Sequence, residues 1–199
     1  MQNTEENIEK TIKRKPKGTL LFPEDFAMLG TSVAIRKALQ RLREKGLIKQ
    51  VAHGIYARPK MNDFIGEVMP SAEDVAKGIA QRDKIRLLPT GAYALNALGL
   101  STQIPLNIVF LTDGAARTIK VGKRTIKLKK TTPKNLLAKG EISALVIQAL
   151  REIGKDKATN EELKKIIELL KKEVPKNLIY DISLAPEWIK EIMKQAQHE

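Results

Sequence analysis

A run of 26 residues without a charged side chain, from Leu87 to Thr112, sets the strongest limit on how this chain can fold. A membrane-spanning helix needs roughly 20 predominantly apolar residues in succession. This run is instead interrupted by polar residues and prolines, at Pro89, Asn96, Ser101, Thr102, Gln103, Pro105 and Asn107. We therefore expect it to form the buried centre of a soluble domain. Because the polar, acidic first ten residues also lack the apolar segment of a signal peptide, we expect a cytoplasmic protein with no membrane partner.

Basic side chains are concentrated in the first two thirds of the chain. The 199 residues include 36 Lys and Arg and 23 Asp and Glu, which gives a net charge of +13. Residues 1–60 contribute +7 and residues 61–134 contribute +6, whereas residues 135–199 are neutral. An excess of this size indicates a polyanionic partner for the first two segments. The absence of cysteine rules out disulfides, thiolate metal sites and a cysteine nucleophile.

The first 60 residues have the element order of a winged helix-turn-helix. Caps and apolar spacing predict a helix over 4–13, a short strand over 19–22, a helical turn over 24–29 and a helix from Ser32 to Lys45. Two short strands around Gly54 follow. In such a domain the third helix enters the DNA major groove and the hairpin contacts the flanking backbone.

The rest of the chain predicts two further parts, so that the fold class is α+β. Residues 61–134 read as a small α+β domain with a helix over 71–81, a strand over 85–88, a helix capped by Thr90, and strands over 107–112, 117–121 and 124–129. Residues 135–199 read as a C-terminal helical region, with helices over 141–153 and 159–173 and a last helix after Pro186.

No arrangement of side chains typical of catalysis or metal binding is apparent. The two histidines, His53 and His198, are 145 positions apart and have no nearby nucleophile or ligand partner in the pattern. Phosphate-binding glycine motifs are also missing. We therefore expect no enzyme, no cofactor, no metal site and no catalytic residue.

DNA contacts are predicted on the third helix, its cap and the wing. At 100° per residue the polar side chains of this helix fall opposite or beside its apolar stripe, where a solvated surface is the alternative reading. Arg, Lys and Gln pair with base edges, and hydroxyls at a helix start donate to phosphate. The predicted contacts are Thr31, Ser32, Arg36, Lys37, Gln40, Arg41, Lys49, His53 and Arg58.

The hairpin at 117–129 forms a second basic surface. Alternation places Thr118, Lys120, Lys127 and Lys129 on one face, and we predict that Lys120, Lys127 and Lys129 contact DNA. The alternative is that these lysines keep an exposed strand soluble and block edge pairing. The few aromatic residues lie mostly in apolar patterns, which favours duplex DNA over single-stranded nucleic acid.

Two stretches resemble the AbiEi-like antitoxins of type IV toxin–antitoxin and abortive-infection systems. The first is the predicted winged helix ending in Gly54-Ile-Tyr-Ala-Arg-Pro59, and the second, more specific one runs from Leu88 to Pro105. The resemblance implies a repressor that binds inverted repeats in its own promoter. It also implies an antitoxin that opposes a nucleotidyltransferase-like toxin without a stable complex. Two alternatives stay open: a structured-RNA-binding protein, and an antitoxin or interaction protein that acts by direct partner contact through residues 135–199.

Overall fold

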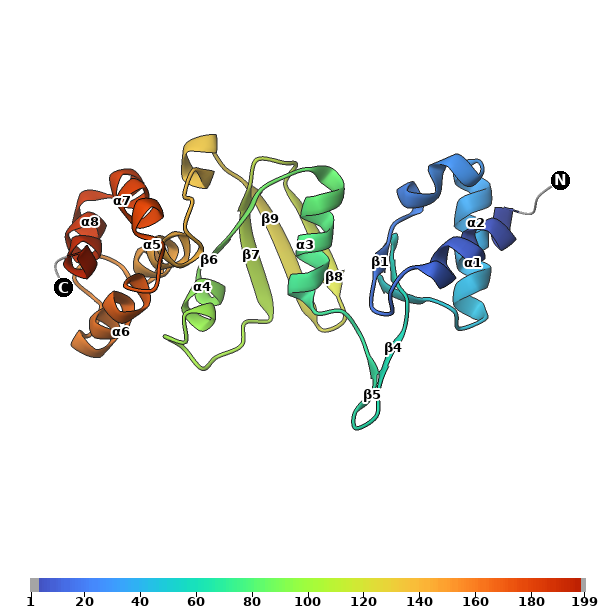
Figure 1. Ribbon diagram of the computed structural model, residues 1–199, viewed down its shortest axis with the longest axis horizontal. Helices are drawn as coiled ribbons and strands as arrows, with labels where there is room; N and C mark the ends of the chain where they lie inside the picture. The colour runs from blue at the N-terminus through green and yellow to red at the C-terminus, as the bar shows by residue number, and fades with distance from the viewer. Residues whose placement is uncertain (1–3, 198–199) are drawn as a thin grey trace. The chain divides into compact units, whose positions relative to one another are not determined.

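The computed structural model describes residues 4–197 and has an α+β architecture, which confirms the expected fold class at that level (Figure 1). The chain divides into two compact units. The first contains the residues up to Ile79 together with Ile119–Lys123, and the second contains Ala80–Thr118 and the residues from Arg124 onward. Among the described residues, no helix is long and apolar enough to cross a membrane.

The first unit begins with helices packed on a small antiparallel sheet. Its elements are α1 (Thr4–Arg14), β1 (Leu20–Leu21), the 3-10 helix η1 (Pro23–Leu29), α2 (Ser32–Glu44), β2 (Lys49–Ala52) and β3 (Ile55–Ala57). The strands are ordered β1-β3-β2. Apolar residues at helical spacing on α1 and α2 meet Phe26 and Leu21 in one core. The predicted helices over 4–13 and 32–45 and the predicted hairpin are therefore present, with ends shifted by one or two residues.

A two-stranded arm follows that the sequence did not predict. It consists of β4 (Lys60–Asn62) and β5 (Gly66–Val68), paired antiparallel with Met61 opposite Glu67. Figure 1 shows this hairpin extending away from the three-stranded sheet of its own unit. The helix α3 (Ala72–Asp83) begins after it, and Ser71 and Asp74 exchange the hydrogen bonds of a capping box at its start.

The uncharged run supplies the middle of the second unit. It forms β6 (Leu87–Thr90), α4 (Ala92–Ala97) and β7 (Asn107–Thr112), which join β8 (Arg117–Val121) and β9 (Arg124–Lys130) in a sheet ordered β6-β7-β9-β8. β7 pairs antiparallel with β6 and parallel with β9. The predicted cap at Thr90 is wrong, because Thr90 pairs with Val109 in the sheet and Gly91, at a φ of 63°, precedes α4 instead. Glycine suits that left-handed position.

The last third of the chain is a helical core. Its elements are η2 (Pro133–Leu136), α5 (Glu141–Ile153), α6 (Asn160–Leu170), α7 (Pro175–Leu184), α8 (Glu187–Lys194) and η3 (Gln195–Gln197). α5 lies at the centre, and its Val146, Ala149 and Leu150 are fully buried. Ala94 and Leu98 belong to the same core, so α4 packs with these helices.

Candidate nucleic-acid interface

The helix α2 exposes the side chains that the sequence predicts as DNA contacts. Thr31 caps it, since its Oγ1 accepts a hydrogen bond from the Ala34 amide at 3.3 Å. Ile35, Ala38, Leu39 and Leu42 point into the core. Among the exposed side chains on the rest of this helix are Ser32, Arg36, Lys37, Gln40 and Arg41, which we call the α2 face.

The polar groups of the α2 face differ in what they contact. Arg36 Nε donates to the Ser32 carbonyl at 3.1 Å, and Gln40 Nε2 donates to Glu44 at 3.1 Å, both one turn away on the same helix. Exposed bonds of this kind exchange readily with water and contribute little stability. Within the described part of the chain, Lys37 contacts no carboxylate. Three of these side chains can therefore turn to a ligand at small cost.

Arg41 instead helps to hold α1 against α2. Glu5, in the first turn of α1, is 8% exposed and accepts from Arg41 Nη1 at 3.2 Å and from Lys45 Nζ at 2.6 Å. The hydrogen bond from Lys45, followed by that from Arg41, lowers the pKa of Glu5 below its ordinary value, against the opposing effect of burial. Glu5 was missed in the sequence because its partners are 36 and 40 positions away. No local spacing signals such a pair.

In and beside the hairpin of the first unit, one predicted DNA-contact residue is exposed at the turn, and two others already have hydrogen-bond or ion-pair partners. His53 is exposed beside Gly54, which has a φ of 68°. Lys49 pairs with Glu67 at 3.3 Å, and the Arg58 guanidinium donates to the Lys15 carbonyl. A ligand that recruits Lys49 or Arg58 has to replace these contacts.

The strands β8 and β9 carry the second group of predicted contacts. Ile126 and Leu128 are buried, whereas Lys127 and Lys129, which alternate with them, are exposed. Lys120 on β8 is also exposed. From Gly114 to Gly140 the chain has nine basic residues and no acidic one. The strand therefore presents lysines that no nearby residue in the sequence neutralises.

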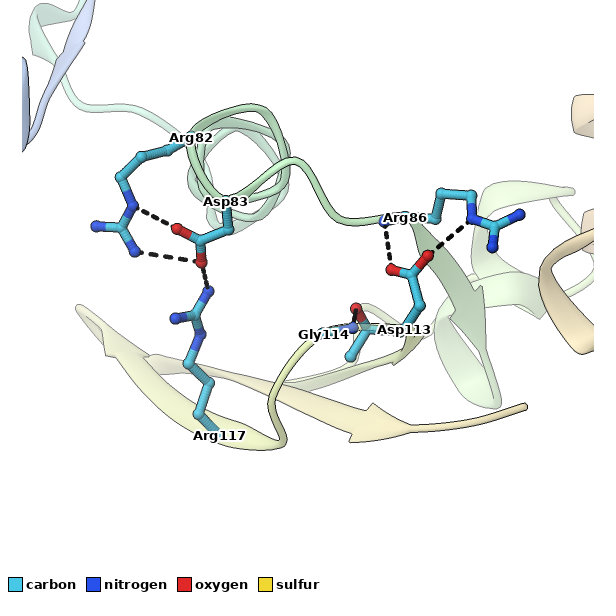
Figure 2. Close-up of polar contacts among 7 residues, drawn as sticks. Arg82, Asp83, Arg86, Asp113, Gly114 and Arg117 are labelled. Carbon is cyan, nitrogen blue, oxygen red and sulfur yellow. Dashed lines mark hydrogen bonds and ion pairs between the residues drawn. The ribbon is translucent and has the colours of Figure 1, made fainter. Parts of the chain in front are cut away.

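Two aspartates hold the segment that leads into β8 (Figure 2). Asp83, at the end of α3, accepts from Arg82 Nε at 2.7 Å and also binds Arg117, the first residue of β8. The hydrogen bond from Arg82 is the main cause of a lowered pKa at Asp83, and Arg117 adds to it while burial opposes it. Asp113 accepts from the Arg86 backbone amide at 2.8 Å and from Arg86 Nε at 2.9 Å.

These contacts fix the start of β8. Gly114 follows Asp113, and its amide donates to Thr112 Oγ1 at 3.0 Å. A Cβ at Gly114 would lie 2.7 Å from Ile85 Cγ2, so the turn needs glycine to pack this closely. No local sequence pattern identifies the two aspartates, although they are the last acidic residues before a long basic stretch.

The described residues contain no group of three or more His, Asp or Glu side chains placed to hold a metal ion. His198 lies outside the described residues. The geometry thus offers cationic and hydrogen-bonding surfaces, whose chemistry suits anionic and polar ligands.

The architecture and these surfaces define the class: an α+β protein that displays basic side chains on an exposed helix and on an exposed strand. A family model matches residues 7–178, and the chain belongs to that family, DUF6088, a family of unknown function. No curated protein matches the chain. Among solved structures, the crystal structure of the RV2827C protein from Mycobacterium tuberculosis is similar at 12% sequence identity and a TM-score of 0.46, covering 98% of this chain and 82% of that chain.

Proposed function

We propose that this chain is a DNA-binding transcriptional regulator whose first part works as a winged helix-turn-helix. The observation that carries this proposal is the α2 face: an exposed, capped, cationic helix placed between the turn of η1 and an antiparallel hairpin. This is the order in which winged helices present a recognition helix and a wing to duplex DNA. The partner is double-stranded DNA, and the sites are inverted repeats in the promoter of its own gene.

The side chains at the start of α2 and along the α2 face differ in chemistry, so they contact different parts of the DNA. Thr31 and Ser32 lie at the start of α2, where hydroxyls and backbone amides meet a phosphate. Arg36, Lys37 and Gln40 carry the donors and acceptors that read guanine and adenine in the major groove. His53, at the turn of the hairpin, lies where a wing approaches the flanking backbone. Arg41 is a weaker base contact in this scheme because Glu5 holds its guanidinium.

Lys120, Lys127 and Lys129 supply additional phosphate contacts. Lysine on an exposed strand binds phosphate as a point charge and carries no sequence information. These residues therefore add affinity and salt dependence, whereas the α2 face supplies the preference for the operator.

A binding titration tests the DNA-binding proposal. The double variant Arg36→Ala and Lys37→Ala removes a base-reading arginine and an unpaired lysine, and we expect operator affinity to fall about 10- to 100-fold. A matched control, Lys155→Ala and Lys157→Ala, removes two exposed cations from the turn between α5 and α6 and should bind like the wild type. If the Arg36 and Lys37 variant binds the operator with the same affinity as the control variant, the α2 face is not the DNA-binding surface. Competition by an RNA duplex of equal length, at equal concentration, would favour the structured-RNA alternative.

The biological role we propose is that of an antitoxin which represses its own operon. This part rests on the resemblance to AbiEi-like antitoxins, in which repression is coupled to protection from a nucleotidyltransferase-like toxin. Co-expression with the product of the adjacent gene should restore growth without co-purification of the two proteins. Stable co-purification would instead favour direct contact, with the neutral helices of residues 135–199 as the docking surface.

A further inference from the structure

The arm formed by β4 and β5 exposes more apolar surface than its size explains. Phe64 is 96% exposed, Ile65 75%, Met61 62% and Met69 41%, so four large apolar side chains lie in solvent within nine residues. Single exposed apolar residues are normal on a protein surface. A cluster of them marks a contact site.

The arm holds these side chains in a defined conformation. Asn62 Oδ1 accepts hydrogen bonds from the amides of Phe64 and Ile65, at 2.9 and 3.2 Å, which fixes the turn at the tip. Gly66 has a φ of 75°, a conformation that favours glycine, and it closes the turn. The ion pair between Lys49 and Glu67 ties β5 to β2. A turn that is already ordered loses less conformational entropy when it binds a partner.

Charge decides which partner suits the arm. Of the charged residues in 60–69, Glu67 is already paired with Lys49, so Asp63 is the acidic side chain beside the apolar tip, on a chain whose total charge is +13. Asp63 directly precedes Phe64, so inserting this tip into DNA would bring a carboxylate toward the phosphates. A basic protein surface is the complementary partner, and a second copy of this chain provides one.

The available area also fits a symmetric pair. A single Phe side chain can bury about 150–250 Å². Covering all four apolar side chains of the arm therefore removes on the order of 500 Å² of accessible surface from each copy. If two copies exchange their arms around a two-fold axis, the total buried surface approaches the roughly 1,200 Å² at which stable interfaces begin.

We propose that the β4–β5 arm is a dimerisation element, which places Phe64 and Ile65 against a second copy of this chain and receives the partner's arm in return. The inference goes beyond the proposed function and does not depend on it. A two-fold dimer would nevertheless match inverted half-sites in an operator.

Oligomeric state measured without DNA tests this proposal. In sedimentation velocity over about 1–100 μM, the wild type should be a dimer, and the double variant Phe64→Ser and Ile65→Ser should be a monomer at every concentration. Met28→Ser is the matched control: Met28 is also 96% exposed but lies on η1, outside the arm, and its substitution should leave the dimer intact. All three proteins should give the same circular dichroism spectrum, because these side chains lie in solvent.

A charge reversal at the tip tests the choice of partner. Asp63→Lys should weaken dimerisation at least tenfold at low salt and by less at high salt, because it repels the basic second copy. A monomeric wild type across the whole range, or a dimeric arm variant, would overturn the proposal. So would weaker binding of the Phe64→Ser and Ile65→Ser variant to a duplex with one half-site, since that result would assign the arm to DNA as an apolar wedge.

Discussion

Neutralising Lys127 and Lys129 should reduce the salt dependence of DNA binding by a calculable amount. Both side chains are exposed on the same face of β9, two residues apart. A strand advances about 3.3 Å per residue, so their Cα atoms are separated by roughly 6.6 Å, about twice the 3.4 Å rise between nucleotides of one DNA strand. The two ammonium groups can therefore bind separate phosphates of one backbone.

The expected magnitude follows from counterion release. Each neutralised phosphate contributes about 0.9 to the slope of log affinity against log salt concentration. Substituting Gln for both lysines should lower that slope by about 1.8. Between 50 and 200 mM salt, a fourfold change, the ratio of wild-type to variant affinity should then shrink by about 12-fold.

Fluorescence anisotropy with a labelled operator duplex at four salt concentrations measures this slope. The control is Lys155→Gln with Lys157→Gln, which removes the same charge from exposed positions between α5 and α6. If the lysines acted only through the net charge of the protein, both variants would show the same decrease in slope. If the Lys127 and Lys129 variant keeps the wild-type slope, these lysines do not touch DNA. Because β9 lies between β7 and β8, their role is then to keep the exposed face of the sheet soluble, and not to block edge pairing.

Two further predictions concern the carboxylates that organise each unit. Glu5→Gln should lower the thermal stability of the first unit at pH 7. Because the pKa of Glu5 is lowered in the folded state, the stabilisation is present above its ordinary pKa and is lost as pH falls through the lowered value, so thermal melts of wild type and variant should converge in acid. Asp181 is fully buried and accepts hydrogen bonds from the Lys139 and Gly140 amides, both at 2.8 Å, and from Ser143 Oγ. Asp181→Asn should cost about 3 kcal/mol in urea unfolding followed by the fluorescence of Trp188, which packs against the same helical core, and a cost below about 1 kcal/mol would contradict this reading.

The sequence predicted those elements whose signals are local. The helix from Ser32 and the helix over 141–153 have apolar side chains at helical spacing and clear ends, and the structure confirms both. The strand over 107–112 was also correct, because a continuous apolar run between polar turns is typical of a central strand.

The elements that the sequence missed depend on contacts between distant residues or on polar turns. The arm has no buried face and thus no alternating pattern; the Asn62 turn and Gly66 define it. The helix α7 begins at Pro175, and its Asp181 stabilises the start of α5 across about 40 residues. Thr90 was misread as a cap because a threonine before a helical pattern also suits the end of a strand.

The pairing of basic side chains ranks the predicted DNA contacts in a way that composition cannot. Arg41, Lys49 and Arg58 already donate to acceptors within their own unit, so a phosphate must compete with those acceptors. Within the described part of the chain, Lys37 and Lys127 contact no carboxylate. A cation without a partner gains the full attraction of an approaching phosphate, whereas a paired cation gains only the difference between two partners. The count of 36 Lys and Arg residues therefore overstates how many cations are free to bind a polyanion, and the affinity for DNA should depend most on the unpaired lysines of α2 and β9.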